Sequence, residues 1–322
     1  MINKFKNINL LENLKPYVSL ARPDNWFKNI FIIPGIILVP FFFSISLDID
    51  LIFRIGLSII ATCLVASSNY VINEVLDAET DKHHPVKKNR PSARGIINTK
   101  IAYIEWIILA VIGISLSFYI NKYVGYANLF LWIMGCLYNI PPIRTKDLVF
   151  LDVISESINN PIRFVIGWYS TGIDTIPPIS VLFAYWMFGA FLMASKRLAE
   201  YRKINNPDIA ALYRKSFRLY NQELLITSSV FYLCLLFMSG MAFVVLYRLE
   251  LVFAVPFFAF LLCYYLHLGF KPDSLIQYPE KLYKEKSLVI LISSFLIYCL
   301  ILIFIIDLPW FENLFIKLKP LR

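Results

Sequence analysis

The sequence has few charged residues and no paired cysteines. Only 16% of its 322 residues are charged, whereas 58% are hydrophobic, and the mean hydropathy is +0.64. Soluble domains carry about 25% charged residues, so this composition excludes an ordinary soluble domain and predicts a polytopic membrane protein. The five cysteines lie singly within apolar runs, without a CxxC pair or metal-ligand spacing, so we assign them no redox or metal chemistry.

The sequence also shows neither the pattern expected of a cleavable leader nor a nucleic-acid-binding motif. The first residues, MINKFKNINLLENLKPYVSLARPDNW, contain bases but no compact apolar core followed by a small-residue cleavage site, so we expect this segment to stay in the mature protein. The bases elsewhere lie in short loops beside apolar runs, with no motif for RNA or DNA. We therefore expect no nucleic-acid partner.

The apolar runs predict an all-α fold, a polytopic membrane bundle of about nine transmembrane helices in a single domain over residues 1–322. Eight or ten spans remain alternatives, because several runs abut. A short segment, residues 1–24, precedes the first span, and residues 308–322 form a candidate interfacial helix. The expected spans are 27–46, 52–75, 101–119, 123–140, 149–172, 178–199, 219–246, 250–269 and 287–306.

Lysine and arginine gather on one side of this expected topology. The N-terminal segment and the loops after the second, fourth, sixth and eighth spans hold nearly all of them, so these loops and the N-terminus are expected to be cytoplasmic. The formal net charge of +9 comes largely from this face. Attraction to anionic lipids of the bilayer is one explanation, and a site for a polyanionic substrate is the other.

The stretch NYVINEVLDAETDKHHPVKKNRP places polar residues at the end of the second span. Asn69, Asn73, Asp77 and Asp81 follow one another at four-residue spacing, which puts them on one face of a helix. Polar groups at this depth are costly and usually functional, although a solvated helix end is the simpler reading. Amide and carboxylate oxygens suit Mg²⁺, which one or two carboxylates commonly hold while substrate phosphates complete its coordination.

A second polar set follows the fourth span in YNIPPIRTKDLVFLDVISESINNPIRF. Its members Asp152, Glu156 and Asn160 repeat at four-residue spacing, and Arg163 comes less than one turn later. Pro161 should kink the helix there. Such residues are expected to line a cavity, and a clasp between helices is the alternative.

Further bases complete the candidate site. At the end of the sixth span, MASKRLAEYRK carries bases that a snorkelling helix end would also explain. Together with the polar sets they suggest a second wall for an anion. The candidate substrate-binding residues are Lys28, Lys87, Arg90, Tyr138, Arg144, Lys146, Asp152, Glu156, Asn160, Arg163, Lys196, Arg197 and Glu200, and the candidate catalytic and metal-binding residues are Asn73, Asp77 and Asp81.

The stretch NEVLDAETDKHHPVKKNRP resembles the first aspartate-rich signature, NxxxDxxxD, of the UbiA-type intramembrane prenyltransferase superfamily. Together with RPDNWFKN, LDVISES, ASKRLAE and PEKLYKEKSL, it looks most like the branch of decaprenyl-phosphate phosphoribosyltransferases. The resemblance implies that Asn73, Asp77 and Asp81 hold Mg²⁺ on a diphosphate, while Lys87 and Arg90 contact phosphate oxygens. The superfamily's usual second acidic motif is reduced here to Glu200, beside Lys196 and Arg197.

The resemblance implies a bacterial inner-membrane enzyme with a cytoplasmic active site that acts on a polyprenyl phosphate or diphosphate lipid. The preferred reaction is phosphoribosyl transfer from phosphoribosyl diphosphate to polyprenyl phosphate, because the site is strongly basic and lacks the second acidic motif. Prenyl transfer from a polyprenyl diphosphate to an aromatic acceptor, of the 4-hydroxybenzoate type, is the alternative. An ion-coupled transporter is a more distant alternative. Its acids are expected near the bilayer midplane, whereas the Asn and Asp residues here lie at the cytoplasmic edge beside a basic loop.

Overall fold

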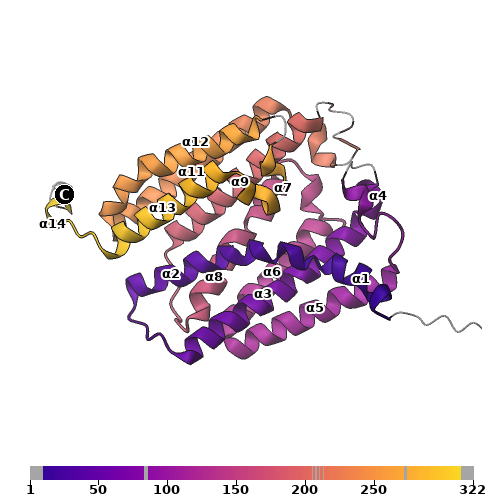
Figure 1. Ribbon diagram of the computed structural model, residues 1–322, viewed down its shortest axis with the longest axis horizontal. Helices are drawn as coiled ribbons and strands as arrows, with labels where there is room; N and C mark the ends of the chain where they lie inside the picture. Colours follow the sequence, from indigo (N-terminus) through magenta and orange to yellow (C-terminus); the bar gives the residue numbers. More distant parts are fainter. Residues whose placement is uncertain are drawn as a thin grey trace, which may run out of the picture. The chain divides into compact units, whose positions relative to one another are not determined.

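The computed structural model describes residues 10–82, 86–204, 206, 209, 211, 212, 214–271 and 274–312, and every regular element within them is helical (Figure 1). The expected all-α fold is confirmed. The chain divides into an N-terminal unit (residues 1–40, 45–175 and 206–220) and a C-terminal unit (41–44, 176–205 and 221–322). The expectation of a single domain stays a prediction.

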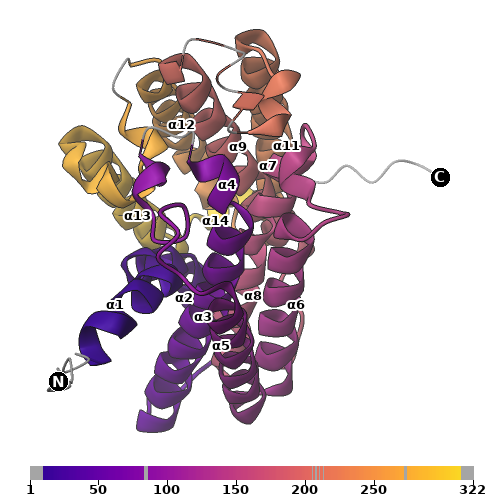
Figure 2. The same ribbon diagram turned by 90° about the vertical axis from the view of Figure 1, so that its right-hand side faces the viewer.

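The N-terminal unit is built around α3, which lies beside α5 and α6 (Figures 1 and 2). Side-chain oxygens begin these helices: Asp48 accepts from the Leu51 N–H at 2.7 Å, Asn98 from that of Lys100 at 3.0 Å, and Asn121 from that of Tyr123 at 2.8 Å. The elements are α1 (Leu10–Ala21), η1 (Pro23–Ile32), α2 (Ile33–Phe42), α3 (Ile49–Leu76), α4 (Ala78–Asp81), η2 (Lys87–Asn89), α5 (Thr99–Ile120), α6 (Lys122–Asn139), η3 (Thr145–Asp147), α7 (Leu151–Ser157), α8 (Asn159–Ser170) and η4 (Lys215–Arg218).

Two glycines let η1 and α2 pack closely on α8. A Cβ atom on Gly35 would overlap the carbonyl oxygen of Phe164, and one on Gly167 would overlap that of Ile32. Such close backbone approach is typical of membrane helix interfaces. Helices in lipid gain little from the hydrophobic effect and associate through close packing, which small residues allow. This contact fixes α8, and with it Asn160 and Arg163, against the N-terminal helices.

The C-terminal unit consists of long apolar helices, of which α9 and α11 pack along each other. Asn221 begins α11 by accepting a hydrogen bond from the Leu224 N–H at 2.7 Å. Its elements are α9 (Ile179–Ile204), α11 (Gln222–Tyr247), η5 (Leu249–Ala254), α12 (Val255–Gly269), η6 (Leu275–Gln277), η7 (Pro279–Lys284), α13 (Lys286–Phe304) and α14 (Pro309–Glu312).

Within the described residues, seven helical segments are long and apolar enough to cross a membrane: 14–42, 49–76, 99–120, 179–204, 222–247, 249–269 and 286–304. The expected spans 123–140 and 149–172 are helical but do not qualify. The 18 residues of α6 include Lys122, Asn128 and Asn139, and the second range is divided at Ile158 into α7 and α8. Nine spans are therefore not confirmed.

Pro161 accounts for that division, as its position predicts. Proline has no N–H with which to bond the carbonyl four residues earlier, which here belongs to Ser157, the last residue of α7. At the other end of the chain, α14 covers only the first part of the expected interfacial helix at 308–322, and residues 313–322 lie outside the described residues.

Candidate functional site

The four-residue repeat lies on an almost continuous helix, as its spacing predicts. Asp77 caps α3 with a backbone φ of −96°, and α4 follows at once. The helical bonding continues through this junction, since the Asp77 N–H donates to the Asn73 carbonyl at 3.0 Å and the Asp81 N–H donates to the Asp77 carbonyl at 2.8 Å. The three candidate metal ligands therefore lie one helical turn apart, from Asn73 in the last turn of α3 to Asp81 at the end of α4.

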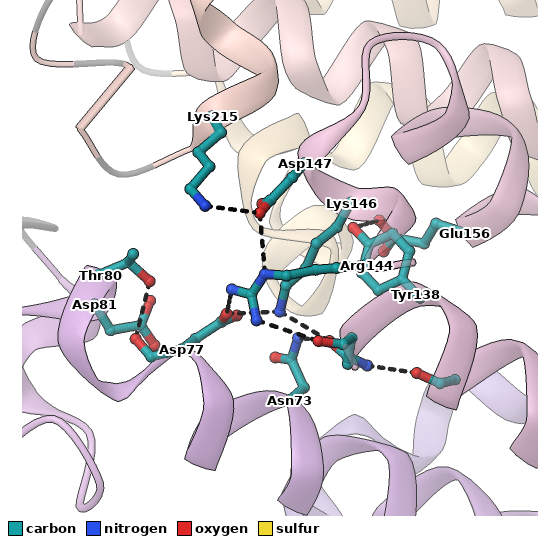
Figure 3. Close-up of polar contacts among 12 residues, drawn as sticks. Asn73, Asp77, Thr80, Asp81, Tyr138, Arg144, Lys146, Asp147, Glu156 and Lys215 are labelled. Atoms are coloured by element: carbon teal, nitrogen blue, oxygen red, sulfur yellow. Dashed lines mark hydrogen bonds and ion pairs between the residues drawn. The ribbon is translucent and has the colours of Figure 1, made fainter. Parts of the chain in front are cut away.

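Two bases from a distant loop hold the carboxylate of Asp77 (Figure 3). Arg144 Nη2 lies 2.8 Å from Asp77 Oδ1, and Lys146 Nζ lies 2.6 Å from the same oxygen. Both bases belong to the connection between α6 and α7, and their side chains are only 16% and 7% exposed. Two buried cations thus converge on one carboxylate oxygen, an arrangement that can also bind an anion.

The conformation of Arg144 directs its guanidinium into this arrangement. Its backbone is left-handed, with φ 32° and ψ 61°, an unusual conformation for a residue with a side chain. The side chain is fixed by Nε donating to Asp147 Oδ2 at 3.1 Å and Nη1 donating to the Asn139 carbonyl at 3.1 Å. Strained backbone that its surroundings hold in place is common at functional sites.

Burial and charge shift the pKa values of the central pair. Burial alone would raise the pKa of Asp77, but the charges of Lys146 and Arg144 outweigh it and the pKa is lowered. Burial lowers the pKa of Lys146 to about 8. The positive charge of Arg144 lowers this pKa further, whereas the negative charge of Asp77 raises it. Asp77 is therefore ionised at neutral pH, and Lys146 is a cation that this environment makes easier to deprotonate.

Asn139 joins Asn73 to the same cluster. Asn73 Nδ2 donates to Asn139 Oδ1 at 2.6 Å, and Lys146 Nζ donates to that oxygen at 2.9 Å. The Asn139 amide donates in turn to the Gly135 carbonyl at 2.8 Å, so its orientation is fixed. These bonds use the amide nitrogen of Asn73 and leave its carbonyl oxygen without a hydrogen bond among the described residues.

Asp81 has a separate basic partner. Arg90 Nη1 lies 2.5 Å from Asp81 Oδ2, and the Asp81 side chain is only 5% exposed. A second pair involves the last turn of α3, where Arg22 Nη2 lies 2.6 Å from the buried Glu74 Oε2. Burial and the charge of Arg22 lower the pKa of Arg90 despite the nearby acids, so these two pairs are electrostatically coupled.

The donor set fits Mg²⁺ chemically. No three carboxylate, imidazole or thiolate side chains gather into a metal site in the described part of the chain. Each of the three candidate ligands nevertheless keeps one oxygen outside the hydrogen bonds described above: Asn73 Oδ1, Asp77 Oδ2 and Asp81 Oδ1. Two carboxylates and one amide suit an ion whose other ligands come from substrate phosphates. The three residues remain predicted ligands.

The second polar set makes contacts of two kinds. The Tyr138 hydroxyl donates to Glu156 Oε2 at 2.9 Å, and Lys146 Nζ lies 6.0 Å from the Tyr138 ring centroid, so this pair adjoins the Asp77 cluster (Figure 3). Asp152 is fully buried and binds side chains of residues 214–220. Both acids come from α7, whose spacing the sequence indicated.

The remaining candidates in the N-terminal unit lie in different surroundings. Arg163 is buried on α8, where its Nε donates to Asn29 Oδ1 at 2.8 Å, and Asn160 is half-buried on the same helix. Lys28 Nζ lies 5.5 Å from the Tyr70 ring centroid. The charge of Lys87 contributes to lowering the pKa of Asp77. The substrate-binding roles of these residues stay predictions.

Lys196, Arg197 and Glu200 lie on α9 in the C-terminal unit. Arg197 is 1% exposed, and its Nη1 lies 3.2 Å from Glu200 Oε2. A buried arginine is unusual for a helix end that merely reaches toward water. The predicted role of this trio as an anion wall stays a prediction.

Several residues of the cluster were not identified from the sequence. Asn139 and Asp147 bind the bases of the Asp77 cluster, and Lys215 Nζ lies 3.3 Å from Asp147 Oδ2. Arg22 and Glu74 form the second pair described above. None repeats with the four-residue spacing, and the Asp147–Lys215 and Arg22–Glu74 pairs join residues that are distant in sequence. An acid within an apolar run, such as Glu74, was the one available signal.

Comparison with known proteins identifies the family. The model of the UbiA prenyltransferase family matches residues 31–275. Decaprenyl-phosphate phosphoribosyltransferase of Mycolicibacterium smegmatis is 30% identical over 223 residues, covering 65% of this chain and 63% of that protein. The protein of the same name from Mycobacterium tuberculosis is 26% identical over 211 residues, covering 65% and 67%. The matched part thus spans about two thirds of these relatives' lengths.

Solved structures agree on the fold. A UbiA homolog from Archaeoglobus fulgidus, bound to GPP and Mg²⁺, superposes with a TM-score of 0.66, at 20% identity and over 89% of this chain and 99% of that one. Family match, helical fold and apolar segments lead to one conclusion: this chain is an integral membrane protein that belongs to the UbiA prenyltransferase family.

Proposed function

We propose that this protein is a Mg²⁺-dependent membrane transferase that moves a phosphoribosyl group from phosphoribosyl diphosphate to a polyprenyl phosphate. The observation that carries the proposal is the Asp77 carboxylate held by both Arg144 and Lys146. This grouping places two buried cations beside two acids and an amide at the end of an apolar helix. The similarity to proteins named decaprenyl-phosphate phosphoribosyltransferase supports the choice of substrates.

In this proposal the bases recognise the leaving diphosphate. Arg144 offers a planar fork that suits phosphate oxygens, while Lys146 supplies a point charge from a buried position. Both are already oriented by Asp77, Asp147 and Asn139, so little reorganisation is needed when negative charge develops on the diphosphate. Arg90, held by Asp81, extends this basic surface.

The acids and the amide have a different role. Asn73, Asp77 and Asp81 would hold Mg²⁺, which supplies positive charge to the diphosphate oxygens when it is bound. Because Asp77 already faces two bases, the local charge disfavours a divalent ion on its own, and the substrate's phosphates would supply the compensating negative charge. We therefore expect metal and diphosphate to bind together.

The acceptor needs little activation in this reaction. A polyprenyl phosphate already carries negative charge on the attacking oxygen, so a general base is not required when the ribose carbon becomes electron-poor. The long apolar chain would remain in the bilayer with its phosphate at headgroup level. A bacterial inner membrane, with the Asp77 cluster on the cytoplasmic side, is the proposed location.

Prenyl transfer to an aromatic acceptor is the second candidate. It is favoured by the structural similarity to a UbiA homolog solved with GPP and Mg²⁺, since GPP is a prenyl diphosphate. The same basic cluster could hold the diphosphate of a prenyl donor. The two reactions differ in which substrate carries the diphosphate.

Mass spectrometry of the lipid products separates these reactions. Purified protein in vesicles is incubated with Mg²⁺ and either polyprenyl phosphate plus phosphoribosyl diphosphate, or polyprenyl diphosphate plus 4-hydroxybenzoate. Our proposal expects a phosphoribosylated lipid in the first mixture only. A prenylated aromatic in the second mixture, with no product in the first, would establish the alternative reaction.

A further inference from the structure

Residues 214–220 of the N-terminal unit are fastened to α7 by a buried carboxylate. Tyr220 Oη donates to Asp152 Oδ1 at 2.8 Å, and Ser216 Oγ donates to Asp152 Oδ2 at 3.2 Å. Arg214 Nη1 lies 3.7 Å from the same Oδ2 atom. Asp152, Ser216 and Tyr220 are at most 3% exposed, so this connection is inaccessible to water. We call Asp152 and Tyr220 the latch.

The latch also reaches the loop that carries the site's bases. The Tyr220 hydroxyl accepts a hydrogen bond from the Phe150 N–H at 2.8 Å, and the two rings meet edge to face with centroids 5.9 Å apart. Phe150 has a positive φ of 64° with ψ −40°, so this bond holds an unfavourable backbone conformation in place. The loop from Arg144 to Phe150 is therefore held at one end by Asp77 and at the other by Tyr220.

This arrangement places further positive charge beside the Asp77 cluster. Asp147 Oδ2 binds both Arg144 Nε, at 3.1 Å, and Lys215 Nζ, at 3.3 Å (Figure 3). Along this line three bases alternate with two carboxylates, in the order Lys146, Asp77, Arg144, Asp147 and Lys215. The Lys215 side chain is 61% exposed, so a soluble anion can reach this end of the line.

We propose that Lys215 and Arg214 form a second anion subsite, which receives a phosphate group that the donor carries apart from its diphosphate, and that Asp152 and Tyr220 position this subsite. The inference rests on the proposed function and makes it more specific. It assigns the donor to the sugar diphosphates that bear a second phosphate ester. A prenyl diphosphate has no such group and would not use the subsite.

Two probes, each with one half of the donor's charge, test the subsite. Binding of ribose 5-phosphate and of inorganic pyrophosphate, each with Mg²⁺, is measured by calorimetry on the full chain in lipid nanodiscs. Lys215→Ala should weaken ribose 5-phosphate binding by about tenfold, which is typical for one lost charge-assisted contact, and change pyrophosphate binding by less than about twofold. Equal weakening of both probes, or of neither, would overturn the subsite.

The latch is tested by Tyr220→Phe, which removes the hydroxyl but keeps the ring that packs against Phe150 and Phe217. It should weaken ribose 5-phosphate binding in the same direction as Lys215→Ala. The latch acts through the subsite, so Tyr220→Phe should weaken ribose 5-phosphate binding less in the Lys215→Ala background than it does in the wild type. Additive effects of the two substitutions would contradict a positioning role.

Two controls keep these outcomes distinct. Tyr119→Phe removes a hydroxyl at the far end of α5, from a side chain that is 79% exposed, and should leave both probes unaffected. Melting temperatures show whether Tyr220→Phe remains folded, and Lys215→Ala tests the subsite without touching the buried latch. If the wild type binds neither probe and transfers no phosphoribosyl group, the proposed function fails. If it does both but Lys215→Ala binds like the wild type, only the subsite fails.

Discussion

Two ion clusters of this protein look alike by composition but differ in what their charges bind. In the N-terminal unit, Arg144 and Lys146 meet one oxygen of Asp77. In the C-terminal unit, Arg248 binds Glu250 at 3.3 Å and Asp307 at 3.4 Å. Both clusters join residues at helix ends that are distant in sequence. The difference lies in the other groups that each arginine contacts.

The Arg248 cluster completes a helix end. Its Nε donates to the Leu302 carbonyl at 3.1 Å and its Nη2 donates to that of Ile306, while Glu250 Oε1 accepts from the Leu308 N–H at 3.0 Å. The Leu302 carbonyl belongs to the last turn of α13, which cannot pair it internally, and Ile306 lies just beyond the end of that helix. Arg248 thereby fastens the end of α13, whereas the Asp77 cluster keeps carboxylate oxygens and an accessible lysine that a ligand can use.

The largest expected effect is that of Asp77→Asn on transfer. The change removes the charge that orients both bases and one predicted metal ligand, so we expect the phosphoribosyl transfer rate to fall by about 10²–10³-fold. Lipid mass spectrometry with labelled donor measures the rate. Asp50→Asn is the matched control, because Asp50 is 73% exposed at the opposite end of α3 and should leave the rate unchanged. An active Asp77→Asn variant would remove this residue from the mechanism.

Lys146→Met should have the next largest effect. Methionine keeps most of the length of the buried side chain but carries no charge with which to bind phosphate, so kcat/KM for the diphosphate donor should fall by about 10- to 100-fold. The KM for polyprenyl phosphate should change less, because this lysine faces Asp77 and Asn139. Steady-state kinetics in vesicles, with each substrate varied in turn, make the comparison. An equal effect on both substrates would show that Lys146 supports the fold of the loop only.

Removing the arginine of the other cluster should give the opposite pattern. Arg248→Ala leaves Glu250, which is 1% exposed, without its basic partner, and we expect a loss of about 3 kcal/mol in stability. Thermal melting in nanodiscs should show a lower midpoint, while the transfer rate of the folded fraction stays at the wild-type value. A loss of transfer without a change in melting would mean that this cluster takes part in the reaction.

The smallest effect is expected for an exposed pair near the site. Lys82 lies 2.7 Å from Glu79, but the two side chains are 48% and 84% exposed. Exposed pairs contribute less than about 1 kcal/mol, so Lys82→Ala should leave both melting temperature and transfer rate almost unchanged. A marked loss of transfer would show that bases close to the Asp77 cluster act through long-range charge and not through contact.

The sequence predicted those features that repeat locally. The spacing of Asn73, Asp77 and Asp81 indicated one helical face, and helical bonds do continue from α3 into α4. Pro161 indicated the interruption that separates α7 from α8. Such features follow from helix periodicity and from the missing proline N–H, which act over a few residues.

Contacts between distant segments could not be predicted in this way. Arg144 and Lys146 were expected near a substrate, but their pairing with Asp77, at separations of 67 and 69 residues, depends on how α3 and α6 pack. Asp152 repeats with Glu156, yet it binds Ser216 and Tyr220 while Glu156 binds Tyr138. Spacing places side chains on a face, but only packing selects their partners.

The difference between the two clusters is tested most directly by melting the protein with and without Mg²⁺ and pyrophosphate. A ligand that binds only the folded state raises the melting temperature. The wild type and Arg248→Ala should both gain stability from this ligand, the latter from a lower starting point, whereas Asp77→Asn and Lys146→Met should gain little. Two results would contradict the assignment of diphosphate binding to the Asp77 cluster. One is a rise in the melting temperature of Asp77→Asn as large as that of the wild type. The other is a loss of this rise in Arg248→Ala but not in the variants of the Asp77 cluster.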